Sequence, residues 1–110
     1  MSARVFKPLA TPSDDGRKFV SFRCPGCDRP HIVEIEGPHA WQFNGDMARP
    51  TISPSYLLTK PAYPDAKPPI AAVVCHSFIN DGQIQFLSDC THALAGQTVP
   101  LPPVDAGGVL

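Results

Sequence analysis

The segment VVCHSFINDGQIQFLSDC, residues 73–90, decides the fold. Its two apolar runs flank the residues NDGQ, and an Asp-Gly pair between apolar strands is among the strongest hairpin signals in a sequence, because both residues accept the positive φ of a tight turn. The segment therefore predicts a β-hairpin in which Asp81 and Gly82 are the two loop residues.

This turn fixes which residues face one another in the hairpin. Cys75 faces Ser88, so Cys75 and Cys90 lie on one face of the sheet as diagonal neighbours. Successive side chains of a strand point to opposite faces, so His76 lies on the other face, where Asp89 is its diagonal neighbour. The register therefore predicts two thiols on one side and an imidazole beside a carboxylate on the other.

Other segments favour further strands. KFVSFRC (18–24) and HIVEIEG (31–37) flank the turn CPGC (24–27), and their alternation of apolar residues is typical of a second hairpin. SYLLT (55–59) is typical of another strand, since it follows an Asn-Gly turn signal. Trp41 is an expected core residue, and so is Phe43.

The segment DCTHALAG, residues 89–96, favours one short helix, which Ser88 or Asp89 would cap and Gly96 would end. The sequence as a whole predicts a mostly β fold, in which β-hairpins form a small, ribbon-like domain with this single helix.

The chain has 110 residues, enough for one domain with a thin core. We expect an N-terminal lead-in over residues 1–16, one β domain over 17–100 and a flexible C-terminal tail over 101–110. A net charge of −1 provides no basic face for nucleic acid. No apolar run reaches the length of a signal peptide or a membrane span, so we expect a soluble, cytoplasmic protein that does not bind membranes.

The four cysteines indicate a zinc site that staples this small domain. A Cys-x-x-Cys turn with glycine is typical of a structural zinc knuckle, and the hairpin brings Cys75 close to Cys90. His76 or His92 in place of one thiolate is an alternative. A thioredoxin-like redox pair is disfavoured, because such a pair usually precedes a helix in a βαβ unit. The predicted zinc ligands are Cys24, Cys27, Cys75 and Cys90.

A closed shell of four thiolates leaves no open position on zinc for chemistry. The polar face is the candidate catalytic site, since His76 beside Asp89 is the base and orienting acid of a nucleophilic triad. The stretch RPTISPS supplies Ser53 or Ser55 as the nucleophile for acyl transfer to water. His92, about one helical turn after Asp89, is an alternative base.

Each of these residues also has a structural interpretation. Ser beside Pro is a common turn former, Asp89 is a natural helix cap, and His76 can satisfy a buried hydrogen bond. His31 and His39 are expected to be ordinary surface residues.

The segments CPGC, WQFNGD, RPTISPS, CHSF and DGQIQFLSDCTHALAGQTV together resemble a family of small proteins of phages and bacteria that is often mislabelled as ammonia monooxygenase. The resemblance covers most of residues 22–100. Family members occur beside bacterial ubiquitin-like conjugation genes and are regarded as zinc-containing peptidases that process the ubiquitin-like protein or remove it from its targets.

The resemblance implies a serine-type peptidase with bound Zn²⁺ and a protein substrate of the ubiquitin-like class. The positions that it carries over are Cys24, Cys27, Cys75 and Cys90 as zinc ligands, and Ser53 or Ser55, His76, Asp89 and His92 as the polar site.

Two other functions account for the same cysteines. One is a non-catalytic zinc-ribbon module that binds another protein, as a phage-encoded inhibitor or adaptor would. The other is a metal-dependent hydrolase with an open zinc, which requires one cysteine to leave the shell. Monooxygenase chemistry is disfavoured, since it needs a redox metal with open positions or an organic cofactor.

Overall fold

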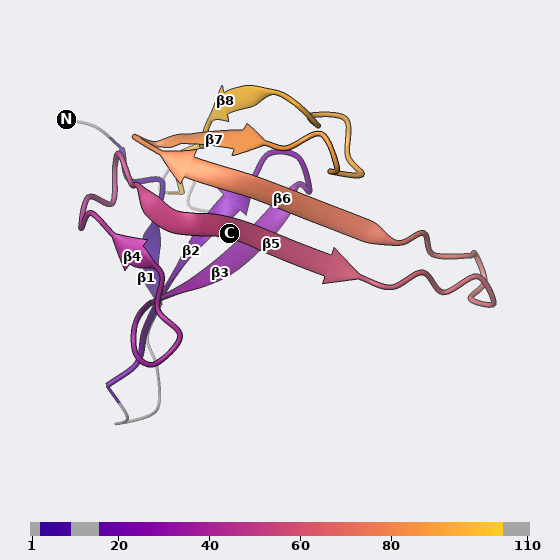
Figure 1. The fold of residues 1–110 in the computed structure, drawn as a ribbon, viewed down its shortest axis with the longest axis horizontal. Coiled ribbons are helices and arrows are strands. Elements are labelled where there is room, and N and C mark those ends of the chain that lie inside the picture. The colour runs from indigo at the N-terminus through magenta and orange to yellow at the C-terminus, as the bar shows by residue number, and fades with distance from the viewer. Residues whose placement is uncertain (1–2, 10–15, 105–110) are drawn as a thin grey trace.

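The computed structural model describes residues 3–9 and 16–104. Within them the chain forms two antiparallel sheets, one of three strands in the order β1-β2-β3 and one of five in the order β4-β5-β6-β7-β8 (Figure 1). The mostly β prediction is therefore confirmed. The strands are β1 (Lys7–Leu9), β2 (Lys18–Cys24), β3 (Arg29–Glu36), β4 (Gln42–Phe43), β5 (Ile52–Lys60), β6 (Val73–Asn80), β7 (Gln83–Phe86) and β8 (Thr98–Pro100).

The hairpin of β6 and β7 has the predicted turn and register. Asp81 and Gly82 both have positive φ, 53° and 78°, and Ser77 faces Phe86. Strand β7 ends at Phe86, earlier than expected, but the next backbone amide, that of Leu87, still donates to the carbonyl of His76 at 2.9 Å. The register therefore persists one residue beyond the strand.

The hairpin of β2 and β3 closes around the CPGC turn, as predicted. Cys24 faces Arg29, and the amide of Asp28 donates to the carbonyl of Cys24 at 2.8 Å. The turn is tight enough to need a positive φ of 56° at Asp28. It leaves Cys24 on the last position of β2 and Cys27 inside the turn.

Side chains from both sheets form one core. The rings of Phe6 and Phe22 stack with their centroids 5.7 Å apart, and Trp41 and Phe43 pack against the same cluster, as predicted. The segments that flank the expected domain contribute too, since Phe6 and Leu101 are buried. Residues 1–2 and 10–15 of the expected lead-in, and 105–110 of the expected tail, lie outside the described residues.

The predicted short helix over residues 89–96 is wrong. The backbone makes separate turns there, with the amide of Ala95 bonded to the carbonyl of His92 and that of Gln97 to Leu94. Other donors of the segment bond elsewhere: the amide of Thr91 bonds the carbonyl of Val74 in β6, and the amide of Leu94 bonds the His92 side chain. Bonds to β6 and to a side chain replace the helical ones. No helix of the described residues is long and apolar enough to cross a membrane.

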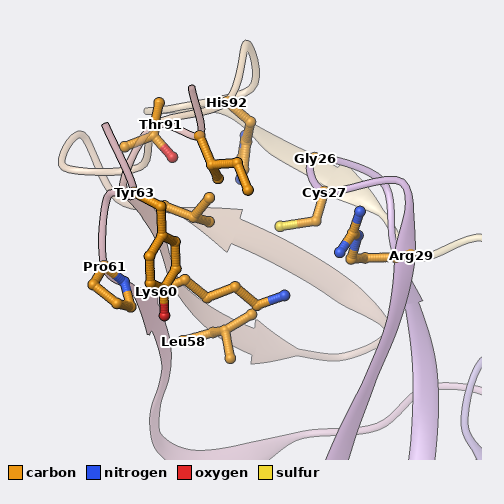
Figure 2. Close-up of a pocket in the computed structure, with 12 residues that line it drawn as sticks. Gly26, Cys27, Arg29, Leu58, Lys60, Pro61, Tyr63, Thr91 and His92 are labelled. Carbon is orange, nitrogen blue, oxygen red and sulfur yellow. The ribbon is translucent and has the colours of Figure 1, made fainter. Parts of the chain in front are cut away.

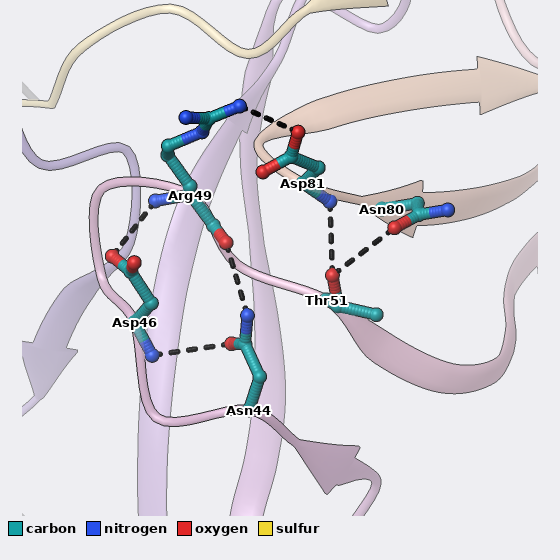
Figure 3. A network of polar contacts seen from close by, with 6 residues as sticks. All are labelled: Asn44, Asp46, Arg49, Thr51, Asn80 and Asp81. Carbon is teal, nitrogen blue, oxygen red and sulfur yellow. Dashed lines mark hydrogen bonds and ion pairs between the residues drawn. The ribbon is translucent and has the colours of Figure 1, made fainter.

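A polar network joins the start of β5 to the turn between β6 and β7 (Figure 3). Arg49 forms an ion pair with Asp81 at 2.6 Å, the amide of Asp81 donates to the Thr51 hydroxyl at 2.9 Å, and that hydroxyl bonds the Asn80 side chain at 3.2 Å. The amide of Gly82 also donates to the carbonyl of Pro50. These bonds fix where β5 begins relative to β6.

Gly82→Ala should destabilise the fold more than Gly45→Ala. Both glycines have positive φ, which costs an alanine about 1–2 kcal/mol. A Cβ at Gly82 would also lie 3.2 Å from Cα of Arg49, whereas one at Gly45 would meet nothing within 4 Å. We expect an additional cost of about 1 kcal/mol at Gly82. Urea unfolding of both variants measures the difference, and equal costs would contradict the close approach.

Candidate active site and metal centre

Three polar side chains meet on the outer face of the five-stranded sheet. Oγ of Ser55 lies 3.0 Å from Nε2 of His76, and Nδ1 of His76 lies 3.2 Å from Oδ2 of Asp89. An ionised carboxylate only accepts, so Nδ1–H donates to Asp89, and Nε2 is then the acceptor for the Ser55 hydroxyl. This is the relation of nucleophile, base and orienting acid in a catalytic triad.

Strands β5 and β6 position the first two residues of this triad. His76 faces Leu57 in the ladder, and Ser55 lies at an irregularity of β5 between Ile52 and Tyr56. The indole Nε1–H of Trp41 donates to the carbonyl of Ser55 at 3.4 Å. The shift in the ladder brings the Ser55 side chain to the same face as His76.

Cys90 holds the acid in place. Its Sγ accepts from the His76 amide at 3.2 Å and donates to the His76 carbonyl at 3.1 Å. Since Asp89 is the preceding residue, these bonds hold it beside the imidazole. The His76 side chain is 25% exposed and that of Asp89 56%, so solvent reaches the triad.

Three cysteines and a histidine meet on the opposite side of the same sheet. The ligand atoms of Cys24, Cys27, His31 and Cys75 all lie within 4.8 Å of one another. None of the cysteines forms a disulfide. Nε2 of His31 is buried without a hydrogen-bond partner among the described residues. Three thiols and an imidazole that lacks a partner fit the donor set of a tetrahedral zinc ion.

The thiols of this cluster interact electrostatically. The thiol of Cys75, at an Sγ–Sγ distance of 3.7 Å, donates a hydrogen bond that lowers the pKa of Cys24, and His31 lowers it further. The same contact and burial raise the pKa of Cys75, and burial raises the pKa of Cys27. Three sulfurs at this separation cannot all carry a negative charge unless a cation lies between them.

Residues 4–87 match the family model described as bacterial ubiquitination-like system serine protease (BubE). The match covers most of the chain. The protein belongs to the BubE family. The matched residues include Ser55 and His76 and all four members of the cysteine and histidine cluster, and they end two residues before Asp89. No curated protein and no solved structure matches the chain.

In this BubE protein the structure brings together Ser55, His76 and Asp89, and it leaves Ser53 and His92 elsewhere. Ser53 is exposed and faces Gln42 of β4. His92 packs edge-on against Phe86, and its Nε2 lies 3.7 Å from Sγ of Cys75. Since Nδ1 of His92 accepts from the Leu94 amide, Nε2–H donates toward that sulfur.

The cluster differs from the expected set of ligands at two positions. Cys90 is not in the cluster, because its sulfur bonds the backbone of His76. His31 is in the cluster and only 4% exposed, so the expectation of an ordinary surface residue is wrong. The sequence contains a signal for His31, because His31 and the apolar Val33 are two residues apart on β3 and therefore lie on the same face of that strand, where both are buried.

A pocket of about 620 Å³ opens beside this cluster, away from the triad. Figure 2 shows the Cys27 sulfur and the charged end of Arg29 on one side of it and the side chains of Leu58, Lys60 and Tyr63 on the other, with the charged end of Lys60 directed across the pocket. Burial raises the pKa of the Cys27 thiol, and the guanidinium of Arg29 lowers it by a smaller amount, because a cation favours the charged form. The pocket wall therefore includes Cys27 of the cysteine and histidine cluster.

Gly26→Ala should destabilise the fold, because a Cβ at Gly26 would overlap the His92 ring. Overpacking of this kind costs about 1–3 kcal/mol. In a His92→Ala background the same change should cost much less, because the ring is gone. Thermal unfolding of the two single variants and the double variant measures this coupling, and additive effects would contradict the contact.

Proposed function

We propose that this BubE protein hydrolyses peptide bonds with Ser55 as nucleophile, His76 as general base and Asp89 as orienting acid. The observation that carries the proposal is the chain of two contacts, 3.0 Å from Ser55 to His76 and 3.2 Å from His76 to Asp89. The first distance suits proton transfer from Ser55 to His76, and the second suits the hydrogen bond by which Asp89 orients the imidazole. The family description supports this class of chemistry.

The reaction proceeds in two halves. Oγ of Ser55 attacks the peptide carbonyl carbon while Nε2 of His76 takes the hydroxyl proton, and the imidazolium then gives this proton to the leaving amine. Water attacks the resulting ester, loses its proton to His76, and releases the acid as Ser55 recovers its proton. Asp89 accepts the hydrogen bond from Nδ1 throughout and stabilises the imidazolium.

Ser55→Ala should lower kcat by at least about a thousandfold without unfolding the protein, because loss of the nucleophile removes the function of the whole triad. Ser53→Ala is the matched control and should keep full activity, since Ser53 faces Gln42 and lies in the same Ser-Pro-Ser stretch. Hydrolysis of fluorogenic peptides and covalent labelling by a fluorophosphonate measure both. Full activity of Ser55→Ala, or a label on another serine, would refute the assignment.

His76→Ala should cost as much as Ser55→Ala, whereas His92→Ala should keep its catalytic rate once the fraction of folded protein is taken into account. The reason is that His92 contacts Cys75 and Phe86 and not the serine. Asp89→Asn should lower kcat by about tenfold or more, because an amide cannot stabilise the imidazolium as a carboxylate does. A large loss of kcat in His92→Ala alone would instead make His92 the base.

We further propose that the substrate is a protein of the ubiquitin-like class, either as a precursor or joined to a target. The support is the family description, which places BubE proteins in a bacterial ubiquitination-like system. The experiment is to incubate the protein with a ubiquitin-like protein fused at its C-terminus to a fluorescent protein and to locate the cleavage by mass spectrometry. Cleavage of unrelated proteins at equal rates would contradict the substrate class.

Zinc is the proposed metal, with Cys24, Cys27, His31 and Cys75 as ligands. The buried Nε2 of His31, which has no hydrogen-bond partner in the part of the chain that the structure describes, supports histidine as the fourth ligand in place of Cys90. Bound zinc would join β2 and β3 of one sheet to β6 of the other, as a structural ion does in a small domain.

His31→Ala should lower the zinc content from about one ion per chain toward zero and unfold the protein, because structural metal binding is coupled to folding. Cys90→Ala should keep its zinc, since Cys90 lies outside the cluster. Elemental analysis of the purified variants measures both. If Cys90→Ala loses its zinc and His31→Ala keeps it, the ligands are instead the four cysteines that the sequence predicted.

A further inference from the structure

The backbone amide and carbonyl of His76 are directed toward the β7 side of β6. Its amide donates to Cys90 and its carbonyl accepts from Leu87, both of which follow β7 in the chain. Leu57 and His76 therefore face each other without exchanging backbone hydrogen bonds. It follows that the amide and carbonyl of Leu57 point away from β6, toward the other edge of β5.

As far as the described residues show, that edge of β5 is open beside the triad. Strand β4 pairs with β5 only at Ile52 and Ser53. Among residues 3–9 and 16–104, no other strand pairs with that edge. Leu57 and Thr59 are exposed there. An unpaired edge strand offers backbone donors and acceptors to an added strand.

Two large apolar side chains near His76, those of Leu57 and Phe78, are exposed to solvent. Leu57 is 55% exposed and faces His76 on the neighbouring strand. The two residues form a pair without backbone hydrogen bonds, and in antiparallel sheets the side chains of such pairs lie closer together than those of hydrogen-bonded pairs. Phe78 is 43% exposed and lies two residues after His76, on the same face of β6. A polar base flanked by exposed apolar groups is suited to a substrate with apolar side chains near the reacting bond.

We propose that the substrate of this site is an extended polypeptide segment that adds to the open edge of β5, bonds the amide and carbonyl of Leu57, and packs an apolar side chain on Leu57 next to the scissile bond. This inference rests on the proposed peptidase function. Main-chain pairing supplies affinity and aligns the peptide beside Ser55, while Leu57 supplies a preference for apolar residues.

Two changes at one position separate these contributions. Leu57→Ser keeps the amide and removes the apolar side chain. Leu57→Pro removes the amide hydrogen, which the pairing with β6 does not use. The matched control is Ile32→Ser, because Ile32 is 56% exposed and lies on β3 of the other sheet.

The assay uses a library of fluorogenic peptides that vary at each position near the scissile bond. Rates are normalised to the fraction of Ser55 that a small fluorophosphonate labels, so that only the intact triad is counted. Leu57→Ser should lower kcat/KM about tenfold for peptides with an apolar residue at one position and remove that preference. Leu57→Pro should lower kcat/KM about fivefold or more for all peptides, mainly through KM.

The inference is overturned if Leu57→Ser keeps both the rate and the preference of Ile32→Ser while Ser55 still labels. If Leu57→Pro does not fold, Leu57→Ser alone decides. A native protein in which fluorophosphonate fails to label Ser55 refutes the peptidase function itself, and the substrate inference with it. These outcomes are distinguishable because the label reports the triad and the library reports substrate binding.

Discussion

The alternation of side chains along β6 is the constraint on which the rest of the structure depends. Cys75 and His76 are adjacent, so one must point into the core and the other to the outer face. The turn at Asp81 and Gly82 then fixes what each of them meets, because it sets the register with β7 and the segment that follows. The cysteine and histidine cluster and the triad thus share strand β6, so the position of one constrains the position of the other.

The two sites support one another through the backbone. The cysteine and histidine cluster takes its members from β2, the CPGC turn, β3 and β6, so a metal ion there would join the two sheets directly behind His76. In front, Cys90 bonds both backbone polar groups of His76 and thereby holds the neighbouring Asp89. A catalytic base needs this kind of support, because small errors of position cost much of its effect.

Membership in the BubE family and the geometry of the triad point to the same chemistry by separate routes. The family match ends at residue 87, so the family model does not cover Asp89, and its contact with His76 is seen in the structure as the hairpin register predicted. In the proposed mode of substrate binding, the open edge of β5 would present a peptide to that triad, since the ladder between β5 and β6 leaves the Leu57 backbone free of β6. Catalysis and substrate alignment would then depend on neighbouring residues of the paired strands β5 and β6.

Local sequence determined the hairpins of this protein and the placement of Cys75 and His76 on opposite faces, because turn residues and two-residue alternation act over short distances. Only the tertiary structure decided between Ser53 and Ser55, since an irregularity within β5 sets which hydroxyl reaches His76. The tertiary structure likewise shows His31, and not Cys90, in the cluster. It also shows turns that bond to β6 where a helix was expected. These outcomes depend on contacts between segments far apart in the chain, and a pattern within one segment carries no information on which distant partner takes a ligand position or a backbone hydrogen bond.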